Sequence, residues 1–578
     1  MTDHVQENKL ATDQPAQMNA PDATQAAPES AAAHHVQASA QGTVLEQIVD
    51  TRKKYLPEIR QIADIAMQGS KLQKSTRSLY EALGAGNRGD AHVIMECKVA
   101  SPSLGLIRDP YDPTELARIY SKYASAISVL CEPEYFGGDL EDLAAVSAST
   151  HLPVLCKDFI IDPTQLVAAR YFGADAALLM LSVLDDDQYR MLAQTANDLG
   201  LDVLTEAATD AELDRALNLG AKIIGINHRN LHDLSIDIER SRRMAPRIPA
   251  GTVIVAESGI RDHRTLREIA PHVSAFLVGS QLSRQSDVDR AVRRLLFGDT
   301  KVCGLSTARG ARAALANGAS FGGFILEETS PRHISIAAAA DIARSVPGLD
   351  YVFVTRETAP KKISNLVEQI LSKFSDEGVA GPHAIQLHGL LAGSGSPMTP
   401  ASITASDACA TSGVTGTSSS VGRANSPLRQ DSAATSGSET SFDVDAELER
   451  LREIRALVPP QIEIWRALDL TTPAGVSAAK ALASTELVDR LVLDSGGGTG
   501  KAFDWEQIPC EALSNALLAG GIGPENAAAA METGATGVDL NSRVEYGSSE
   551  RKNQKDPAKI NAALQAVRRP CRAENFSK

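Results

Sequence analysis

The feature of this 578-residue sequence that most limits its fold is a regular alternation of short apolar strands and amphipathic helices. Eight candidate strands follow one another roughly 20–35 residues apart, and helical patterns such as 162–171 and 185–199 lie between most of them. Eight strands that are each followed by a helix predict a closed parallel βα barrel. The predicted strands are 92–98, 124–131, 153–159, 176–181, 202–207, 223–229, 252–258 and 275–280.

The same rhythm starts again near Gly298 and predicts a second barrel of eight strands. An open, doubly wound sheet is the alternative fold for each half. That fold normally carries a glycine-rich dinucleotide turn after its first strand, and V-A-S-P-S-L-G at 99–105 is not such a turn. We therefore expect an α/β protein of two tandem (β/α)8 TIM barrels. The second set of strands is 301–305, 321–327, 350–356, 384–389, 462–468, 490–495, 517–522 and 537–541.

Two segments do not have the composition of a folded domain. Residues 1–42 contain no aromatic residue and are rich in Ala, Gln, Asp and Pro. Residues 391–440 hold 36 Ser, Thr, Gly, Ala or Pro among 50, also with no aromatic residue. Such stretches cannot bury enough apolar surface to become ordered. We expect a disordered tail at 1–42, a barrel at 43–298, and a barrel at 299–578 with a disordered insert at 391–440.

Composition excludes several classes of protein. The net charge of −15 argues against nucleic-acid binding, which needs a basic surface. The sequence contains no run of about 18 apolar residues, so it predicts no membrane span. The first residues, M-T-D-H-V-Q-E-N, do not resemble a signal peptide. Seven cysteines without C-x-x-C spacing indicate neither a disulfide framework nor a zinc site. We expect a cytoplasmic monomer that uses no metal or cofactor.

Polar side chains gather at the carboxyl ends of several of the first eight strands, where such barrels carry their active sites. Glu96 and Lys98 share one face of the strand I-M-E-C-K, because side chains alternate along a strand. An ion pair at the sheet edge would be a purely structural explanation, but the pattern recurs on other strands. The other strand-end residues are Lys157, Glu206, Asn227, Arg229, Glu257, Ser258, Gly259, Gly279 and Ser280.

These residue types suit acid–base chemistry on a phosphorylated substrate. A desolvated lysine can act as a general acid near neutral pH, with a neighbouring carboxylate as base. The turns E-S-G at 257–259 and V-G-S at 278–280 follow the seventh and eighth strands. Barrels bind phosphate at these turns through backbone N–H groups, although a tight βα turn alone would also explain V-G-S.

The first barrel resembles indole-3-glycerol phosphate synthase over about 44–298. The motifs that carry the resemblance are E-C-K-V-A-S-P-S, L-C-K-D-F-I, L-L-M-L-S-V-L, L-T-E, G-I-N-H-R-N-L, E-S-G-I and G-S. That family converts 1-(2-carboxyphenylamino)-1-deoxyribulose 5-phosphate to indole-3-glycerol phosphate, with loss of CO2 and water. The resemblance implies that Lys157 is the general acid of ring closure and that Glu206 serves the dehydration.

By the same resemblance, Lys98 pairs with the substrate carboxylate, and Glu96 positions Lys98 and the anilino nitrogen. Asn227 and Glu257 complete the catalytic set. The remaining residues of the set are implied to lie in or near the substrate and phosphate sites: Ser101, Arg229, Ser258, Gly259, Gly279 and Ser280.

The second barrel has polar residues and glycines at its strand ends as well. Cys303 lies in the first strand of this set, K-V-C-G-L. Alternation alone does not settle whether its side chain faces inward or outward, and a buried core cysteine is the structural alternative. Arg332 in T-S-P-R-H is available to an anion, and Asp494 precedes the loop S-G-G-G-T-G. Glycines let backbone N–H groups approach a phosphate, although the glycine runs alone are a weak signal. Other strand-end residues are Gln386, His388, Gly520, Gly521, Asp539, Asn541 and Ser542.

Together these motifs resemble phosphoribosylanthranilate isomerase over about 299–578. That family performs an Amadori rearrangement whose product is the substrate of the first barrel's family. The resemblance implies that Cys303 is the general base, which needs a lowered thiol pKa, that Asp494 is the general acid, and that Arg332 binds the anthranilate carboxylate. Two features depart from the family: the loop after Asp494 looks one residue shorter, and the insert directly follows His388. Residues implied to hold the phosphate region are Gly520, Gly521, Asp539, Asn541 and Ser542.

Two other interpretations remain open from the sequence. A pair of phosphate-binding barrels from histidine biosynthesis would rely on catalytic aspartates, whereas these strands read E-C-K and L-C-K-D. A second barrel that serves only as a scaffold or effector-binding module would not need both Cys303 and Asp494. The leading hypothesis is a bifunctional enzyme of two successive steps in tryptophan biosynthesis.

Overall fold

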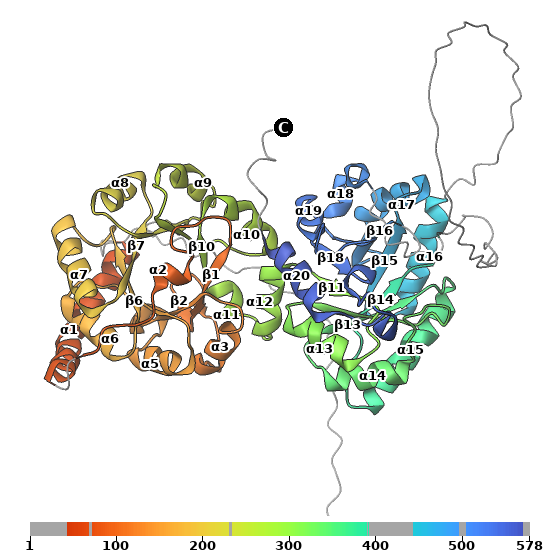
Figure 1. Cartoon of the computed structure of the whole chain (residues 1–578), viewed down its shortest axis with the longest axis horizontal. Helices are drawn as coiled ribbons and strands as arrows, with labels where there is room; N and C mark the ends of the chain where they lie inside the picture. Colours follow the sequence, from red (N-terminus) through yellow and green to blue (C-terminus); the bar gives the residue numbers. More distant parts are fainter. Residues whose placement is uncertain are drawn as a thin grey trace, which may run out of the picture. The chain divides into compact units, whose positions relative to one another are not determined.

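The chain forms two closed barrels, each made of eight parallel strands surrounded by helices (Figure 1). The computed structural model describes residues 43–68, 72–230, 234–389, 391, 443–495 and 504–569. The predicted tail at 1–42 and nearly all of the predicted insert at 391–440 lie outside these described residues. The prediction of two (β/α)8 barrels is confirmed.

The strands of the first barrel follow chain order around the barrel, and the last strand pairs with the first. Each predicted strand is present, with its ends shifted by at most a few residues. A two-stranded ribbon, β2 (Ala100–Ser101) and β3 (Gly105–Leu106), follows the first strand. The barrel strands are β1 (His92–Cys97), β4 (Ala126–Leu130), β5 (Val154–Lys157), β6 (Ala176–Met180), β7 (Asp202–Ala207), β8 (Ile223–Asn227), β9 (Val253–Glu257) and β10 (Ala275–Val278).

The helices of the first barrel begin where the sequence carries start signals. Asp162 caps the helix that starts at Pro163, and Gln165 completes a capping box. The helices are α1 (Val44–Gln68), α2 (Leu79–Ala82), α3 (Pro113–Tyr120), α4 (Pro133–Phe136), α5 (Leu140–Ser149), α6 (Pro163–Tyr171), α7 (Asp186–Leu199), α8 (Asp210–Asn218), α9 (Arg240–Met244), α10 (His263–Ile269), α11 (Ser280–Ser283) and α12 (Val288–Phe297).

The second barrel also closes in chain order, with β11 paired to both β12 and β18. Its strands are β11 (Lys301–Val302), β12 (Phe321–Ile325), β13 (Asp350–Thr355), β14 (Ala384–Leu387), β15 (Glu463–Asp469), β16 (Arg490–Asp494), β17 (Ala516–Leu518) and β18 (Gly537–Leu540). Its helices are α13 (Ala308–Ala316), α14 (Ile336–Ser345), α15 (Pro360–Asp376), α16 (Val444–Leu457), α17 (Pro473–Ala483), α18 (Cys510–Leu513), α19 (Ala527–Glu532) and α20 (Pro557–Arg568).

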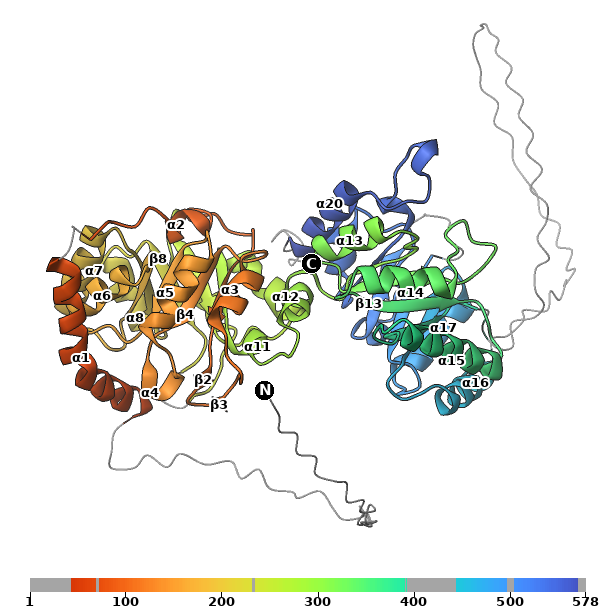
Figure 2. The same ribbon diagram turned by 90° about the horizontal axis from the view of Figure 1, so that it is seen from below.

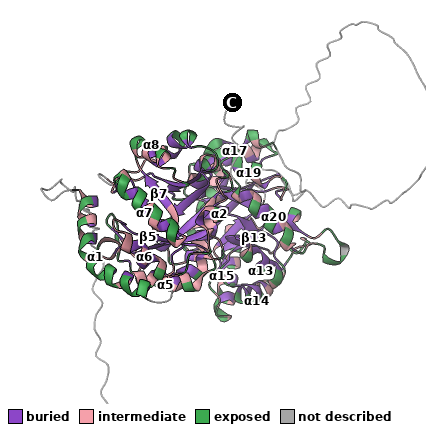
Figure 3. Ribbon diagram, turned by 60° about the vertical axis from the view of Figure 1, so that its left-hand side comes forward, coloured by how far each residue is buried: buried purple, intermediate pink, exposed green. Residues whose placement is uncertain are grey.

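Alternation along the strands sorts side chains into two layers. On β1, Val93, Met95 and Cys97 belong to the layer between strands and helices, whereas Ile94 belongs to the cluster inside the barrel. Glu96 is therefore on the interior face, at the end of the barrel that carries the predicted site. In Figure 3 the barrel strands are buried, and the outer faces of the surrounding helices are exposed.

Helix α1 precedes the first barrel in the chain and packs against α6 on its outside (Figure 2). Arg52 on α1 forms a buried ion pair with Asp158, the residue after β5, with Nη2 and Oδ2 2.6 Å apart. This contact ties α1 to the strand end that carries Lys157. None of the helices that the structure describes is long and apolar enough to cross a membrane.

Candidate active sites

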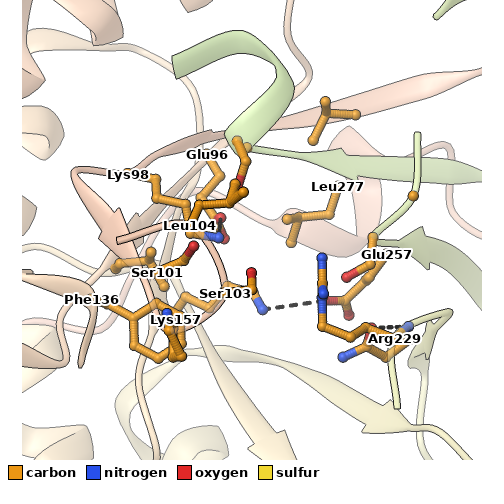
Figure 4. A pocket seen from close by; sticks show the side chains of 18 of the residues that line it. Glu96, Lys98, Ser101, Ser103, Leu104, Phe136, Lys157, Arg229, Glu257 and Leu277 are labelled. Atoms are coloured by element: carbon orange, nitrogen blue, oxygen red, sulfur yellow. Dashed lines mark hydrogen bonds and ion pairs between the residues drawn. The ribbon is translucent and has the colours of Figure 1, made fainter. Parts of the chain in front are cut away.

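The first barrel encloses a cavity of about 520 Å³ at the carboxyl ends of its strands. A cavity of this size suits a small-molecule ligand. Figure 4 shows the labelled side chains of Glu96, Lys98, Lys157, Arg229 and Glu257 around it. All the residues predicted for this site line the cavity: Glu96, Lys98, Ser101, Lys157, Glu206, Asn227, Arg229, Glu257, Ser258, Gly259, Gly279 and Ser280.

Lys157, the last residue of β5, is surrounded by carboxylates. Its Nζ lies 3.3 Å from Oε2 of Glu257 and 3.9 Å from Oε2 of Glu206. Burial lowers the pKa of Lys157, but the charges of Glu257, Glu206 and Glu96 outweigh burial and raise the pKa overall. Three carboxylates, from β1, β7 and β9, meet at this ammonium and keep it protonated near neutral pH. The ammonium carries the proton that a general acid needs.

Lys98 and Glu96 form the second charge pair of the cavity. Lys98 Nζ lies 2.9 Å from Oε1 of Glu96. Burial raises the pKa of Glu96, but Lys98 and Lys157 lower it more, so this carboxylate stays ionised. A β-carbon at Gly279 would lie 2.4 Å from Oε1 of Glu96, so only glycine leaves room for this carboxylate. The sequence assigned Gly279 to phosphate binding, and the packing gives it a second reason to be glycine.

Glu257 is a carboxyl group of the site whose pKa is raised rather than lowered. Burial raises its pKa to about 7, assisted by Glu206 and opposed by Lys157. Its Oε1 is buried and accepts no hydrogen bond within the described residues. A β-carbon at Gly225 would lie 2.1 Å from that oxygen, so glycine at this position, which the sequence did not single out, leaves room for the carboxylate. Asn227 donates from Nδ2 to Oε1 of Glu206 at 3.1 Å and fixes that neighbouring carboxylate.

The two turns predicted to bind phosphate face the same cavity. Ser258 and Gly259 both have positive φ, at 68° and 78°, which turns the backbone sharply after β9. Ser280 begins the short helix α11, and the hydroxyl of Ser101 is buried without a hydrogen-bond partner in the described structure. Arg229 donates from Nη1 to the carbonyl of Leu234 at 3.1 Å. The phosphate role of this group stays a prediction.

Aromatic and aliphatic side chains that the sequence analysis missed complete the cavity. Phe136 and Phe159 line it with ring centroids 6.0 Å apart, and Lys98 Nζ lies 5.7 Å from the ring centre of Phe136. Ile48 of α1 lines the cavity as well. Alternation could have identified Phe159, because it lies two residues beyond Lys157. No local signal identifies Phe136 or Ile48, since they come from a short helix and from a helix before the barrel.

In the second barrel, Cys303 lies directly after β11 and faces the interior. Its backbone N–H continues the strand pairing by donating to the carbonyl of Leu540 at 2.8 Å. A β-carbon at Gly323 on β12 would lie 2.8 Å from Sγ of Cys303, so glycine is required beside the thiol. Burial raises the pKa of Cys303 overall, although Lys301 lowers it. The resemblance implies a lowered pKa, whereas the almost complete enclosure of the thiol raises it in this structure.

Asp494 ends β16 with its side chain in the interior. Its Oδ1 accepts the N–H of Ser495 at 2.7 Å, and Nε2 of His388 lies 3.6 Å from Oδ2. Burial raises the pKa of Asp494, which suits a carboxyl group that must donate a proton. Burial lowers the pKa of His388 to about 4, so its ring is neutral near pH 7 and makes no ion pair with Asp494. A β-carbon at Gly520 would lie 2.8 Å from Oδ1 of Asp494.

Arg332 is predicted to bind a carboxylate, and it already holds one. Its Nε and Nη2 donate to the two carboxylate oxygens of Glu545 at 2.7 and 2.9 Å. Glu545 also accepts from Lys555 at 2.7 Å, and Lys555 donates to the side chain of Asn541 at 2.9 Å. The predicted residues Arg332 and Asn541 thus belong to one charged network. Glu545 and Lys555 were not predicted, since they lie beyond the last strand.

The other residues predicted for the second site are placed as follows. Gln386 and Asp539 are both buried in the barrel interior and hydrogen bond to Lys301. Gly521 has a positive φ of 70° after β17, and Ser542 begins a short 3-10 turn after β18. The phosphate contacts of Gly521, Asp539 and Ser542 stay predictions. The glycine-rich loop at 496–503 lies outside the described residues.

Comparison with known proteins gives the same assignment to the two barrels. Residues 45–295 match the family model of indole-3-glycerol phosphate synthase, and residues 448–566 match that of N-(5'phosphoribosyl)anthranilate isomerase. Tryptophan biosynthesis protein TrpCF of Corynebacterium glutamicum is 47% identical over 87% of this chain and 93% of its own length. TrpCF of Yersinia pestis is 39% identical over 91% of this chain and 94% of its own. Phosphoribosyl anthranilate isomerase from Thermus thermophilus aligns at 22% identity over 46% of this chain and 97% of its own, with a TM-score of 0.30.

Proposed function

The chain belongs to the TrpCF family of bifunctional tryptophan biosynthesis proteins, and we propose that the strand-end side chains described above carry out its two reactions. The second barrel isomerises N-(5-phosphoribosyl)anthranilate to 1-(2-carboxyphenylamino)-1-deoxyribulose 5-phosphate. The first barrel cyclises and decarboxylates that product to indole-3-glycerol phosphate. One observation carries the residue-level proposal. Strand-end residues of the first barrel line one cavity, and in the second barrel Asp494 lies beside His388 and Gly520, in the combination that acid–base catalysis needs.

In the first barrel, Lys157 donates a proton to the carbonyl oxygen of the substrate as the ring closes. Glu257 and Glu206 hold its ammonium in place through the contacts at 3.3 and 3.9 Å. Lys98, oriented by Glu96, pairs with the carboxylate that later leaves as CO2. Glu206 then exchanges a proton in the loss of water. The phosphate is held by the backbone of 257–259 and 278–280.

In the second barrel, Cys303 removes the proton from C2 of the ring-opened substrate, and Asp494 gives a proton to the ring oxygen as the ribose opens. The raised pKa of Asp494 supports this role, because the carboxyl group must be protonated to act as an acid. Arg332 exchanges Glu545 for the carboxylate of the anthranilate. His388 stays neutral and lies beside Asp494.

The activity of the second barrel is tested with the intact chain and N-(5-phosphoribosyl)anthranilate as the sole substrate. We expect indole-3-glycerol phosphate to accumulate, and the aminoketose intermediate to accumulate instead when Lys157 is replaced. A chain that turns over only the aminoketose, and never the anthranilate ribosyl phosphate, would contradict catalysis by the second barrel and favour a scaffold.

We also propose that the enzyme is a cytoplasmic monomer that binds no nucleic acid, with the boundary between its barrels at residues 298 and 299. The described cysteines are all free thiols, which supports a reducing compartment. The net charge of −15 supports the absence of nucleic-acid binding. Light scattering of the purified chain tests the oligomeric state, and a molecular mass of twice 61.2 kDa would contradict a monomer.

A further inference from the structure

A buried lysine at the start of the second barrel has no role in the mechanism above. Lys301 is the first residue of β11, and its side chain is fully enclosed inside the barrel. Its Nζ donates to Oδ2 of Asp539 and to Oε1 of Gln386, both at 2.7 Å. Asp539 is on the neighbouring strand β18, whereas Gln386 is on β14, three strands away around the barrel. The ammonium therefore lies in the middle of the barrel, below the catalytic end.

Cys303 lies directly above this ammonium. The two residues are separated by one position on the same strand, so their side chains leave on the same face. A β-carbon at Gly323 would lie 2.8 Å from Sγ of Cys303 and 2.9 Å from Cε of Lys301. The thiol and the end of the lysine side chain thus cover the same face of Gly323. An ammonium has three N–H donors, and two are used by Asp539 and Gln386.

We propose that Lys301 is a positioning residue that holds the thiolate of Cys303 in the isomerase reaction, with its third N–H directed to the sulfur. This proposal rests on the proposed function, since it assumes that Cys303 is the base. Lys301 does not touch the substrate and acts only through the thiol. Asp539 and Gln386 keep the ammonium charged and fix its position in a place without water.

The charges around the thiol support this arrangement. Burial is the largest influence on the pKa of Cys303 and raises it; Lys301 and Lys555 lower it, and Asp539 raises it. Arg332 also faces the thiol, since the charge of Cys303 acts on its pKa. His388 is neutral near pH 7. Asp494 raises the pKa of Asp539, and Lys301 lowers the pKa of Asp494. Lys301 is thus the main group that offsets the burial of a thiol that must ionise to act as a base.

A buried ion pair could instead be only part of the barrel core. Lys301 and Asp539 would then stabilise the fold, and removal of either partner would damage the barrel in the same way. The two explanations predict different effects of these substitutions on the ionisation of Cys303. If Lys301 acts on the thiol, loss of its charge makes Cys303 harder to ionise, whereas loss of Asp539 makes it easier to ionise.

The test compares Lys301→Met with Asp539→Asn in the full-length chain. The readout is the pH dependence of iodoacetamide alkylation at Cys303, followed by mass spectrometry of the peptide that contains it. We expect the midpoint to rise by about one pH unit or more in Lys301→Met, which corresponds to at least about a tenfold loss of thiolate near pH 7.5. In Asp539→Asn the midpoint should fall below that of the wild type. Isomerase kcat/KM should fall at least about tenfold in Lys301→Met, with its rise displaced to higher pH.

Synthase activity of the same chains serves as an internal control for the first barrel. Circular dichroism of the whole chain, compared with the wild type, then shows whether the second barrel also folds. If Lys301→Met does not fold, the double variant Lys301→Met/Asp539→Asn removes both charges together. The midpoint of its alkylation curve should then lie at higher pH than that of the wild type, because Lys301 lowers the pKa of Cys303 more than Asp539 raises it. An unchanged midpoint, or a shift of both single variants in the same direction, would overturn the proposal. A Cys303→Ala chain that isomerises normally would instead refute the role of Cys303 itself.

Discussion

Both barrels bury a lysine among polar groups, but the two lysines lie at opposite ends of their strands. Lys157 is the last residue of β5, so its ammonium reaches the cavity and meets Glu206 and Glu257 from β7 and β9. Lys301 is the first residue of β11, and its ammonium is enclosed below Cys303. In our proposals, the same residue type thus gives a proton to a substrate in one barrel and only supports another side chain in the other. Position along the strand decides which of these roles the lysine can have.

The largest effect is expected for the lysine at the cavity. Lys157→Ala should lower synthase turnover by about 10²–10⁴-fold, the usual loss when a general acid is removed, and leave the isomerase unchanged. Each activity is assayed on its own substrate with the same protein. A variant that retains more than about a tenth of synthase turnover would show that Lys157 is not the acid.

The converse pair of changes belongs to the second barrel. Cys303→Ala and Asp494→Asn should each abolish isomerisation, with losses of about 10²-fold or more, because they remove the base and the acid. The synthase of these variants should work normally on supplied aminoketose. Steady-state rates with N-(5-phosphoribosyl)anthranilate decide the matter, and normal isomerisation by either variant would make that residue a core or loop residue.

A smaller effect is expected from the carboxyl group whose pKa is raised to about 7. Glu257 takes up a proton as the pH falls through 7, so its attraction for Lys157 weakens below that pH. Synthase kcat should therefore rise with pH through about 7 in the wild type, whereas Glu257→Gln should lack this step and lose about tenfold in rate. The isomerase profile serves as the control. A variant that keeps the titration near pH 7 would assign it to another group.

The smallest effect is expected from the insert that distinguishes the second barrel. Replacing 392–440 by a short Gly-Ser turn should leave the synthase unchanged and keep isomerase kcat/KM within about tenfold. Leu391 is retained because it packs against the hydrophobic core. The segment has no aromatic residue and few large aliphatic side chains that a lid would bury over a substrate, and closing a long loop costs little. A hundredfold loss in a folded variant would instead indicate a working lid.

The sequence by itself determined the positions of all sixteen barrel strands and most of the strand-end residues. The reason is that both signals are local. A strand buried between a barrel interior and a layer of helices must be a short apolar run, and every second residue near its carboxyl end faces the cavity whatever the other strands contain. Glu96, Lys98, Lys157 and Glu257 could therefore be assigned one strand at a time.

Only the tertiary structure decided how these groups alter one another. The raised pKa of Lys157 depends on carboxylates from three other strands, and the raised pKa of Cys303 depends on how completely the barrel encloses it. Nothing in the local sequence distinguishes Lys301 from other strand residues, because its partners Gln386 and Asp539 are 85 and 238 residues away. Electrostatic effects depend on distance through space and on exclusion of water, and neither is fixed by spacing along the chain.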